Sequence, residues 1–202
     1  MTAAALADAG CISDLGEAEL AIRRLTAADP GDPDSRVSEL DRAAVEAYIA
    51  RRRGGDPPQY ILGGSDFMNK WISLDQTTYI PRPWTEAMVH RGVAILKGAR
   101  GPKMVVDVGT GSGAIAGVVA DAVADCHVWA LDVDRQSLRW AQINTASATN
   151  VTVLLSDLFG ALPDNLAGHV DLVIGSLPYV PSMELANMPR DYREHEPRAA
   201  HD

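Results

Sequence analysis

Residues 105–114 read VVDVGTGSGA, and this stretch decides the fold that we expect. An apolar run leads into glycines at 109, 111 and 113, which is typical of a buried strand that turns sharply into a helix. Such glycines let a ligand approach the backbone, and the first turn of the helix offers unpaired N–H groups. The pattern therefore predicts a ligand site lined by Gly109, Thr110, Gly111 and Gly113.

The chemistry of this turn favours S-adenosylmethionine over a dinucleotide. Gly109, Gly111 and Ala114 also fit the G-x-G-x-x-A spacing of dinucleotide-binding turns. Asp107, however, stands at the end of the strand, where a carboxylate attracts a cationic ligand and repels a pyrophosphate. Gly113 extends the spacing to G-x-G-x-G. A nicotinamide-dependent dehydrogenase is therefore the less favoured alternative.

Carboxylates also follow the next two predicted strands. Asp132 ends one apolar run about 20 residues after the glycines, where a carboxylate can accept hydrogen bonds from both ribose hydroxyls. We interpret the neighbouring Asp134 as the N-cap of the next helix. Asp157 follows a later apolar run and could accept from an adenine amino group, with a helix cap or a loop turn as the alternative. Val133 and Leu158 complete the predicted cofactor-binding set.

Short apolar runs alternate with helical segments in the second half of the chain. Such alternation indicates an α/β fold with a parallel sheet that is buried on both faces. Ahead of it we predict a helical cap over residues 1–56 and a linker hairpin over 57–84, with strands near 67–72 and 77–80. The cofactor-binding domain is then predicted over 85–202. The apolar runs lie at 104–106, 128–131, 151–155 and 170–174.

Composition limits the class of protein. The 202 residues carry a net charge of -9 and are 47% hydrophobic, which suits one globular domain with a small appendage and excludes bulk disorder. No apolar run reaches about 18 residues, so we expect no membrane span. Cys11 and Cys126 make no disulfide framework, and the five histidines lack metal-ligand spacing. We expect a soluble, cytoplasmic protein without a metal, and the acidic charge disfavours nucleic acid as a direct ligand.

Four motifs follow the strands of the predicted sheet: DVGTGSGAIA at 107–116, LDVD at 131–134, SDLF at 156–159 and LPYVP at 177–181. Together they resemble the motifs of class I S-adenosylmethionine-dependent methyltransferases. Two further stretches, PPQYILGGSDF at 57–67 and YIPRPWTEAMV at 79–89, narrow the resemblance to the HemK-like protein-(glutamine-N5) group, the release factor glutamine methyltransferases. The resemblance implies a Rossmann-like sheet with strand order 3-2-1-4, S-adenosylmethionine as the cofactor, and methylation of a glutamine side chain in a protein, a translation release factor.

The loop after the fourth strand departs from the family's pattern. The family carries Asn-Pro-Pro-Tyr there, and this chain carries Ser176, Leu177, Pro178 and Tyr179. The resemblance implies that Ser176, Pro178 and Tyr179 form the catalytic loop. A serine hydroxyl cannot present the paired donor and acceptor of an asparagine amide. The sequence therefore leaves two alternatives open: a protein that binds S-adenosylmethionine with altered or lost transferase activity, and an adenine-N6 methyltransferase of nucleic acids.

The C-terminal stretch REHEPRAAHD at 193–202 resembles the family's segment after this loop. The family's sheet continues beyond that segment, so we expect a truncated form whose sheet is incomplete on its C-terminal side. The fourth strand, 170–174, would then have an open edge that could pair with a second copy or with a partner chain. Trp84 stands where the family usually has glutamate.

Overall fold

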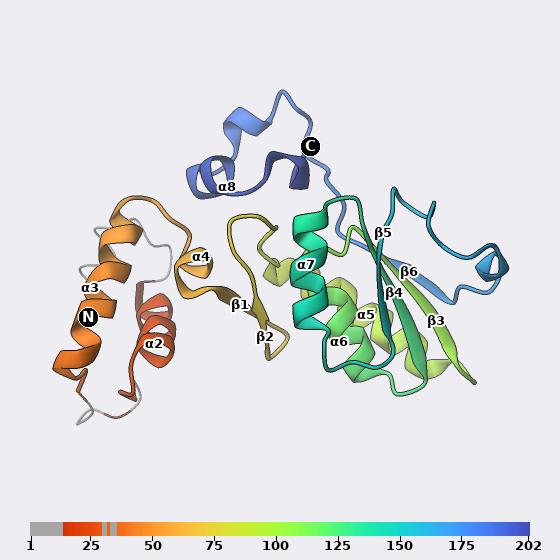
Figure 1. The fold of residues 1–202 in the computed structure, drawn as a ribbon, viewed down its shortest axis with the longest axis horizontal. Coiled ribbons are helices and arrows are strands. Elements are labelled where there is room, and N and C mark those ends of the chain that lie inside the picture. The colour runs from red at the N-terminus through yellow and green to blue at the C-terminus, as the bar shows by residue number, and fades with distance from the viewer. Residues whose placement is uncertain (1–13, 30–31, 33–35) are drawn as a thin grey trace. The chain divides into compact units, whose positions relative to one another are not determined.

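The computed structural model describes residues 14–29, 32 and 36–202. The first residues of the predicted cap and Cys11 lie outside the described residues. By its contacts the chain divides into two compact units, which we describe separately (Figure 1). One unit comprises Met1–Gly63 with Met188–His195, and the other comprises Gly64–Asn187 with Glu196–Asp202.

Helices build the first unit. They are α2 (Asp14–Leu25), α3 (Glu39–Arg53), α4 (Pro58–Leu62) and α8 (Arg190–His195). Ser38 caps α3 by accepting from the Asp41 N–H, which satisfies one of the free donors at the start of the helix. Tyr48 of α3 packs among alanines of α2, and its hydroxyl donates to Glu17 at 2.5 Å. Arg52 donates to the same carboxylate at 2.7 Å, so a buried polar contact joins α2 to α3.

The second unit begins with a two-stranded hairpin. β1 (Gly64–Phe67) pairs antiparallel with β2 (Lys70–Ser73). Met68 and Asn69 connect them with φ of 50° and 62°, the left-handed geometry of a tight hairpin turn. A hairpin lies within residues 57–84 as predicted, but its predicted strands are wrong: the turn lies inside the predicted first strand, and residues 77–80 form no strand. Those residues follow a turn in which the Asp75 carboxylate accepts from the Thr77 N–H at 2.9 Å, and they form no strand hydrogen bonds.

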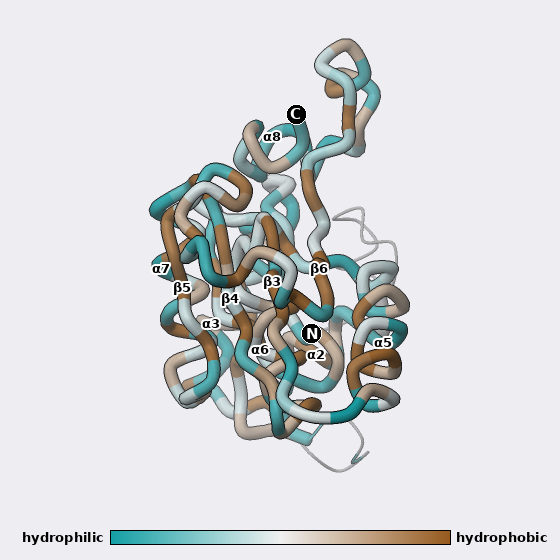
Figure 2. Tube along the Cα trace, turned by 90° about the vertical axis from the view of Figure 1, so that its right-hand side faces the viewer, coloured by the Kyte–Doolittle hydropathy of each residue, from teal (hydrophilic) through white to brown (hydrophobic). Residues whose placement is uncertain are grey.

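A parallel four-stranded sheet forms the centre of this unit. Its strands are β3 (Lys103–Val108), β4 (Cys126–Asp132), β5 (Val151–Leu155) and β6 (Leu172–Ile174). They are arranged in the order β5-β4-β3-β6, which confirms the predicted order. Figure 2 shows hydrophobic segments concentrated along these strands. The predicted α/β fold with a Rossmann-like sheet is confirmed.

Helices cover one face of the sheet. They are α5 (Pro83–Gly98), α6 (Ala114–Ala122) and α7 (Arg135–Asn144). Apolar side chains of α5 and α6 join Val105 and Val128 in the main core, and α7 contacts β4 and β5. On the other face Val106 and Leu131 are buried in a smaller cluster beneath the segment that precedes β6. Burial on both faces is therefore confirmed for β3 and β4. It is wrong for β6, because no described element covers Val173, which is 53% exposed.

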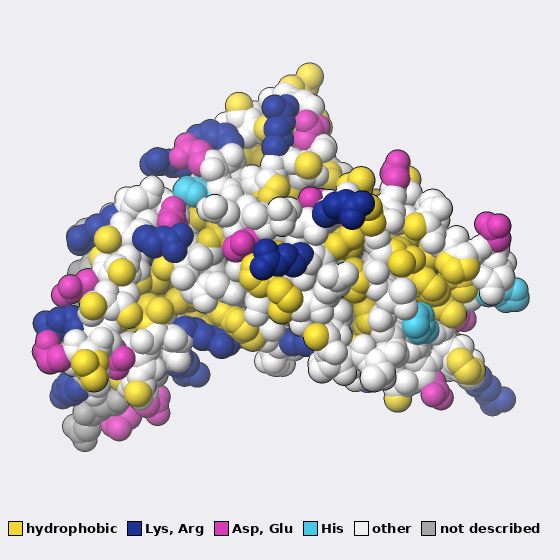
Figure 3. All heavy atoms as spheres, viewed as in Figure 1, with side chains coloured by type: hydrophobic (Ala, Val, Ile, Leu, Met, Phe, Trp, Pro, Cys, Tyr) yellow, Lys and Arg dark blue, Asp and Glu magenta, His cyan; other side chains and the backbone are white. Residues whose placement is uncertain are grey.

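β6 lies at the edge of the sheet and pairs only with β3 among the described strands. Figure 3 shows hydrophobic atoms exposed over the sheet region. Association of the chain through this edge stays a prediction. In the described part of the chain, no helix combines the length and the apolar character that a membrane crossing requires.

Candidate active site

The glycine-rich turn joins β3 to α6, and its geometry explains its composition. Gly109, Gly111 and Gly113 have φ of 67°, 55° and 79°, a region in which a side chain is strained. A Cβ on Gly113 would also lie 2.8 Å from the Cα of Ala141 in α7. The Thr110 N–H donates to the carbonyl of Leu131 at 2.8 Å, which ties the turn to the end of β4. The turn thus carries its backbone close to any ligand above the sheet.

Asp107 lies beneath this turn and is fully buried. Its Oδ2 accepts from the Thr110 hydroxyl at 2.6 Å and from the Ala116 N–H at 3.0 Å. Its Oδ1 is also buried but has no hydrogen-bond partner among the described residues. Burial raises the pKa of Asp107 to about 7, the two hydrogen bonds oppose that rise, and nearby Asp132 adds to it. A buried carboxylate oxygen without a donor is a place for a cationic group of a ligand.

Asp132 holds the other side of the turn. Its Oδ2 accepts from the Gly111 N–H at 2.8 Å, and its Oδ1 accepts from the Asp134 N–H at 2.9 Å. Burial raises its pKa, and these backbone hydrogen bonds oppose the rise. Each carboxylate oxygen can accept a second hydrogen bond, so ribose hydroxyls remain possible donors. Asp134 caps α7 by accepting from the N–H groups of Gln136 and Ser137, the role that the sequence suggested for it.

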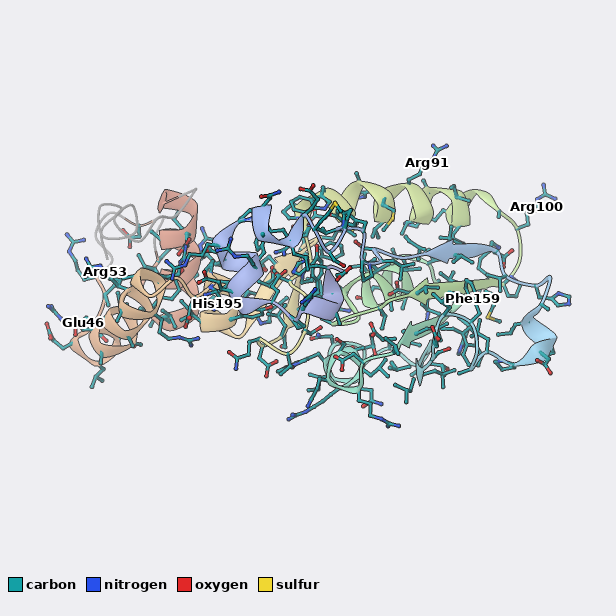
Figure 4. The ribbon with its side chains drawn as sticks, turned by 90° about the horizontal axis from the view of Figure 1, so that it is seen from above. Glu46, Arg53, Arg91, Arg100, Phe159 and His195 are labelled. Atoms are coloured by element: carbon teal, nitrogen blue, oxygen red, sulfur yellow. The ribbon has the colours of Figure 1, made fainter. Side chains whose placement is uncertain are left out.

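Apolar side chains are exposed after β4 and β5, on the same end of the sheet as the turn. Val133 is 71% exposed and Leu158 is 54% exposed. The Ser156 N–H donates to the Asp132 carbonyl at 2.9 Å, so the ends of the two strands are joined. Phe159, labelled in Figure 4, is half exposed beside them and was missed by the sequence reasoning. Such a surface can contact the faces of an adenine ring, and the exposed Asp157 lies next to it in the chain.

The loop after β6 lies directly beside the glycine-rich turn. Gly175 approaches the end of β3 so closely that a Cβ would clash with the Val108 carbonyl oxygen. Leu177 then places its Cδ2 2.7 Å from the position that a Cβ on Gly109 would take. Tyr179 is 69% exposed. Gly175 was missed by the sequence reasoning, although a glycine that follows an edge strand is a signal of close backbone approach.

The predicted residues are therefore brought to one end of the sheet. Asp107, Asp132 and the turn form one part, and the loop from Ser176 to Tyr179 forms another, with Leu177 against Gly109. The buried Oδ1 of Asp107 fits the ammonium group of S-adenosylmethionine, and the strained glycines fit a ligand close to the backbone. Among the described residues, no cluster of three or more His, Cys, Asp or Glu side chains could hold a metal ion.

Comparison with known proteins agrees with this geometry. Residues 105–195 match a family model described as a methyltransferase domain. The parallel sheet, the glycine-rich turn and this match define the fold as that of a class I methyltransferase. The chain is 32% identical over 196 residues to the release factor glutamine methyltransferase of Streptomyces coelicolor, an alignment that covers 96% of this chain and 69% of that protein. It is 36% identical over 165 residues to the enzyme of the same name from Bordetella pertussis, covering 81% of this chain and 60% of the relative.

The chain belongs to the release factor glutamine methyltransferase family. It spans 57 to 60% of the length of three of the curated relatives that it matches. One of them, from Rhodopirellula baltica, is 34% identical over 174 residues, which cover 83% of this chain and 58% of that protein.

Proposed function

We propose that this chain transfers the methyl group of S-adenosylmethionine to the side-chain amide nitrogen of a glutamine in a protein, with a translation release factor as that protein. The observation that carries the proposal is the contact between Leu177 and Gly109. It brings the loop that would hold the acceptor amide beside the turn that would hold the cofactor. Methyl transfer needs that proximity above all, because it is an in-line displacement.

Different residues of the site would bind different parts of S-adenosylmethionine. Asp107 would pair with the ammonium group of the cofactor, and Asp132 would accept the ribose hydroxyls. Val133 and Leu158 would contact the adenine, and Asp157 would accept its amino group. The bound cofactor supplies a methyl group on a positively charged sulfur. Residues 85–202 would form the cofactor-binding domain, 57–84 the linker and 1–56 the cap, in a protein that acts in the cytoplasm.

The loop would orient the acceptor amide. An amide nitrogen is a weak nucleophile because its lone pair is delocalised into the carbonyl. When it forms a bond to the methyl carbon, the carbon–sulfur bond breaks and its electron pair stays on sulfur, and the nitrogen then releases a proton to water. Backbone carbonyls of the loop can accept the N–H groups of the amide, and the exposed ring of Tyr179 can pack beside it.

A second candidate function is binding of the cofactor with altered or lost transfer. The Leu177 contact favours it as well, because the leucine takes the place of the family's first proline and extends over the turn. Ser176 has a shorter side chain than asparagine and cannot pair with an amide through both donor and acceptor. Both changes act on the acceptor and leave Asp107 and Asp132 untouched.

Methyl transfer to a glutamine-bearing peptide from a release factor distinguishes these functions. The wild-type chain and the double variant Ser176→Asn, Leu177→Pro would be incubated with labelled S-adenosylmethionine and the peptide. We expect transfer to be faster in the variant by about tenfold or more, because restored alignment acts on the reaction step. Affinity for S-adenosylhomocysteine should change by less than about twofold, since the variant leaves the hydrogen bonds of the cofactor site intact.

A peptide with asparagine in place of the glutamine is the matched control. Label on the glutamine peptide alone supports the proposal. Tight cofactor binding without label from either protein would support the second function instead. Label on DNA or RNA from a lysate, with none on protein, would replace both with an adenine-N6 methyltransferase.

A further inference from the structure

A buried ionic cluster joins two segments of the second unit that are far apart in the sequence. Arg82 Nη2 lies 2.5 Å from both carboxylate oxygens of Glu196. The side chain of Arg82 is 5% exposed and that of Glu196 is fully buried. His201 is also buried, and its Nε2 lies 2.9 Å from Glu196 Oε2 without the geometry of a hydrogen bond. The three side chains thus form one contiguous buried polar group.

Tyr79 closes the cluster from a further side. The Arg82 guanidinium carbon lies 4.6 Å from the centre of the Tyr79 ring, and Arg82 Nε donates to the Tyr79 hydroxyl at 3.2 Å. The rings of Tyr79 and His201 meet edge to face with centroids 5.6 Å apart. Arg82 is therefore held by a carboxylate and an aromatic ring at once, so its position is well defined. The proposed cofactor and catalytic residues are not members of this cluster.

The same C-terminal segment holds the loop after β6. The Val180 N–H donates to the carbonyl of His201 at 2.9 Å. The Ser182 hydroxyl lies 2.8 Å from both carboxylate oxygens of Asp202. Residues 175–181 have no regular secondary structure, so their position depends on such contacts at their ends. One end leaves β6 through Gly175, and the other is tied to residues 201 and 202.

We infer that the Arg82–Glu196 pair, together with His201, holds the loop from Ser176 to Pro181 in place against the glycine-rich turn. The chain of contacts runs from Arg82 to Glu196, through His201 to the Val180 N–H, and so to the segment that carries Leu177 and Tyr179. Arg82 and Glu196 are then positioning residues for the acceptor site. That this loop binds the acceptor rests on the proposed function. Whether the Arg82–Glu196 pair holds the loop in place can be measured without methyl transfer.

Hydrogen exchange on the purified chain tests this inference. Exchange of peptides that cover residues 176–183 would be followed by mass spectrometry in the wild type, in Arg82→Gln and in Glu196→Gln. Each variant removes one charge of the buried pair, so the C-terminal segment should detach and expose the Val180 amide. We expect exchange of these peptides to accelerate by about tenfold or more, with no change in peptides from β3 and β4. Arg82→Lys should give an intermediate rate, because a lysine keeps the charge but not the planar fork.

Arg198→Gln is the matched control. Arg198 makes the same type of ion pair in the same segment, with Asp202 at 3.5 Å, but its side chain is 75% exposed. Its loss should leave exchange of the loop unchanged, because exposed pairs contribute little. Affinity for S-adenosylhomocysteine should stay within about twofold of wild type in Arg82→Gln and Glu196→Gln, since the hydrogen bonds of Asp107 and Asp132 are kept.

Two results would overturn the inference. Unchanged exchange at residues 176–183 in both variants would show that the loop holds its position without the pair. Acceleration that is equal across β3, β4 and the loop would show that the pair supports the whole unit rather than the loop. If the wild type transferred no methyl group to the peptide, that result would count against the proposed function. It would not affect the inference about the loop, which rests on hydrogen exchange alone.

Discussion

Replacing Asp107 with asparagine should remove the pH dependence of cofactor binding. Burial raises the pKa of Asp107 to about 7, so its carboxyl group is about one-tenth ionised at pH 6 and about nine-tenths ionised at pH 8. An ammonium group of the cofactor gains most from the ionised form. The affinity of the wild type for S-adenosylhomocysteine should therefore rise about tenfold between these two values, or about 1.4 kcal/mol.

The asparagine variant is close to isosteric with the wild type. Its side-chain oxygen can still accept from the Thr110 hydroxyl and the Ala116 N–H, the two donors that now face Oδ2. Its amide nitrogen would take the position of the unpartnered Oδ1. Binding would be measured by calorimetry from pH 6 to pH 8, and the variant's own curve corrects for titration of the ligand. We expect the variant to bind weakly and with a much flatter dependence on pH.

The same substitution should change the stability of the unliganded protein, with a definite sign. The pKa of Asp107 in the folded protein is about 7, above the ordinary value of 3.8. Between these two pH values the folded protein therefore binds more protons than the unfolded protein. The stability that this preference contributes is present below about pH 4 and is lost as the pH rises through about 7. The free energy of unfolding of the wild type should therefore be lower above about pH 7 than below about pH 4 by about 4 kcal/mol from this group, a difference that urea unfolding can resolve. Equal pH profiles for wild type and variant, in both binding and unfolding, would refute the assignment of Asp107.

Further predictions concern the glycine-rich turn. Asp132→Ala should weaken binding of S-adenosylhomocysteine by about 1–3 kcal/mol, because it removes an acceptor for the ribose and the partner of the Gly111 N–H, and unchanged affinity in calorimetry would exclude the ribose role. Gly113→Ala should lower the free energy of unfolding by about 2–4 kcal/mol, from a strained φ and a clash with Ala141. Gly98→Ala is its control in urea unfolding, since a Cβ there meets nothing within 4 Å, and an equal loss in both variants would contradict the steric argument.

The ligand turn could be predicted because it depends on local pattern. Glycines at 109, 111 and 113 directly after an apolar strand allow the left-handed φ that a tight turn into a helix requires. A carboxylate at the end of that strand then lies beneath the turn. The order β5-β4-β3-β6 followed from the family that the motifs resembled. The role of Asp134 as an N-cap also follows from its immediate neighbours.

The hairpin shows where local pattern is insufficient. The sequence predicted strands on both sides of residues 73–75, whereas the turn lies at Met68 and Asn69. A two-residue turn of this type needs left-handed backbone at both positions. Asparagine favours that conformation but methionine does not, so the pair Met68-Asn69 was a weak turn signal. The register was decided by which side chains could be buried together: Phe67 and Ile72 both enter the main core.

What the sequence by itself determined is the identity of the strand, turn and carboxylates that would bind the cofactor, because these lie within short stretches whose backbone and polarity limit their conformation. Only the tertiary structure decided what lies against them. Leu177 meets Gly109 across the sheet edge, and Arg82 meets Glu196 across a separation of 114 residues. Neither contact has a periodic or local signal, since each exists only after β6 has paired with β3 and the C-terminal segment has packed on the residues before α5.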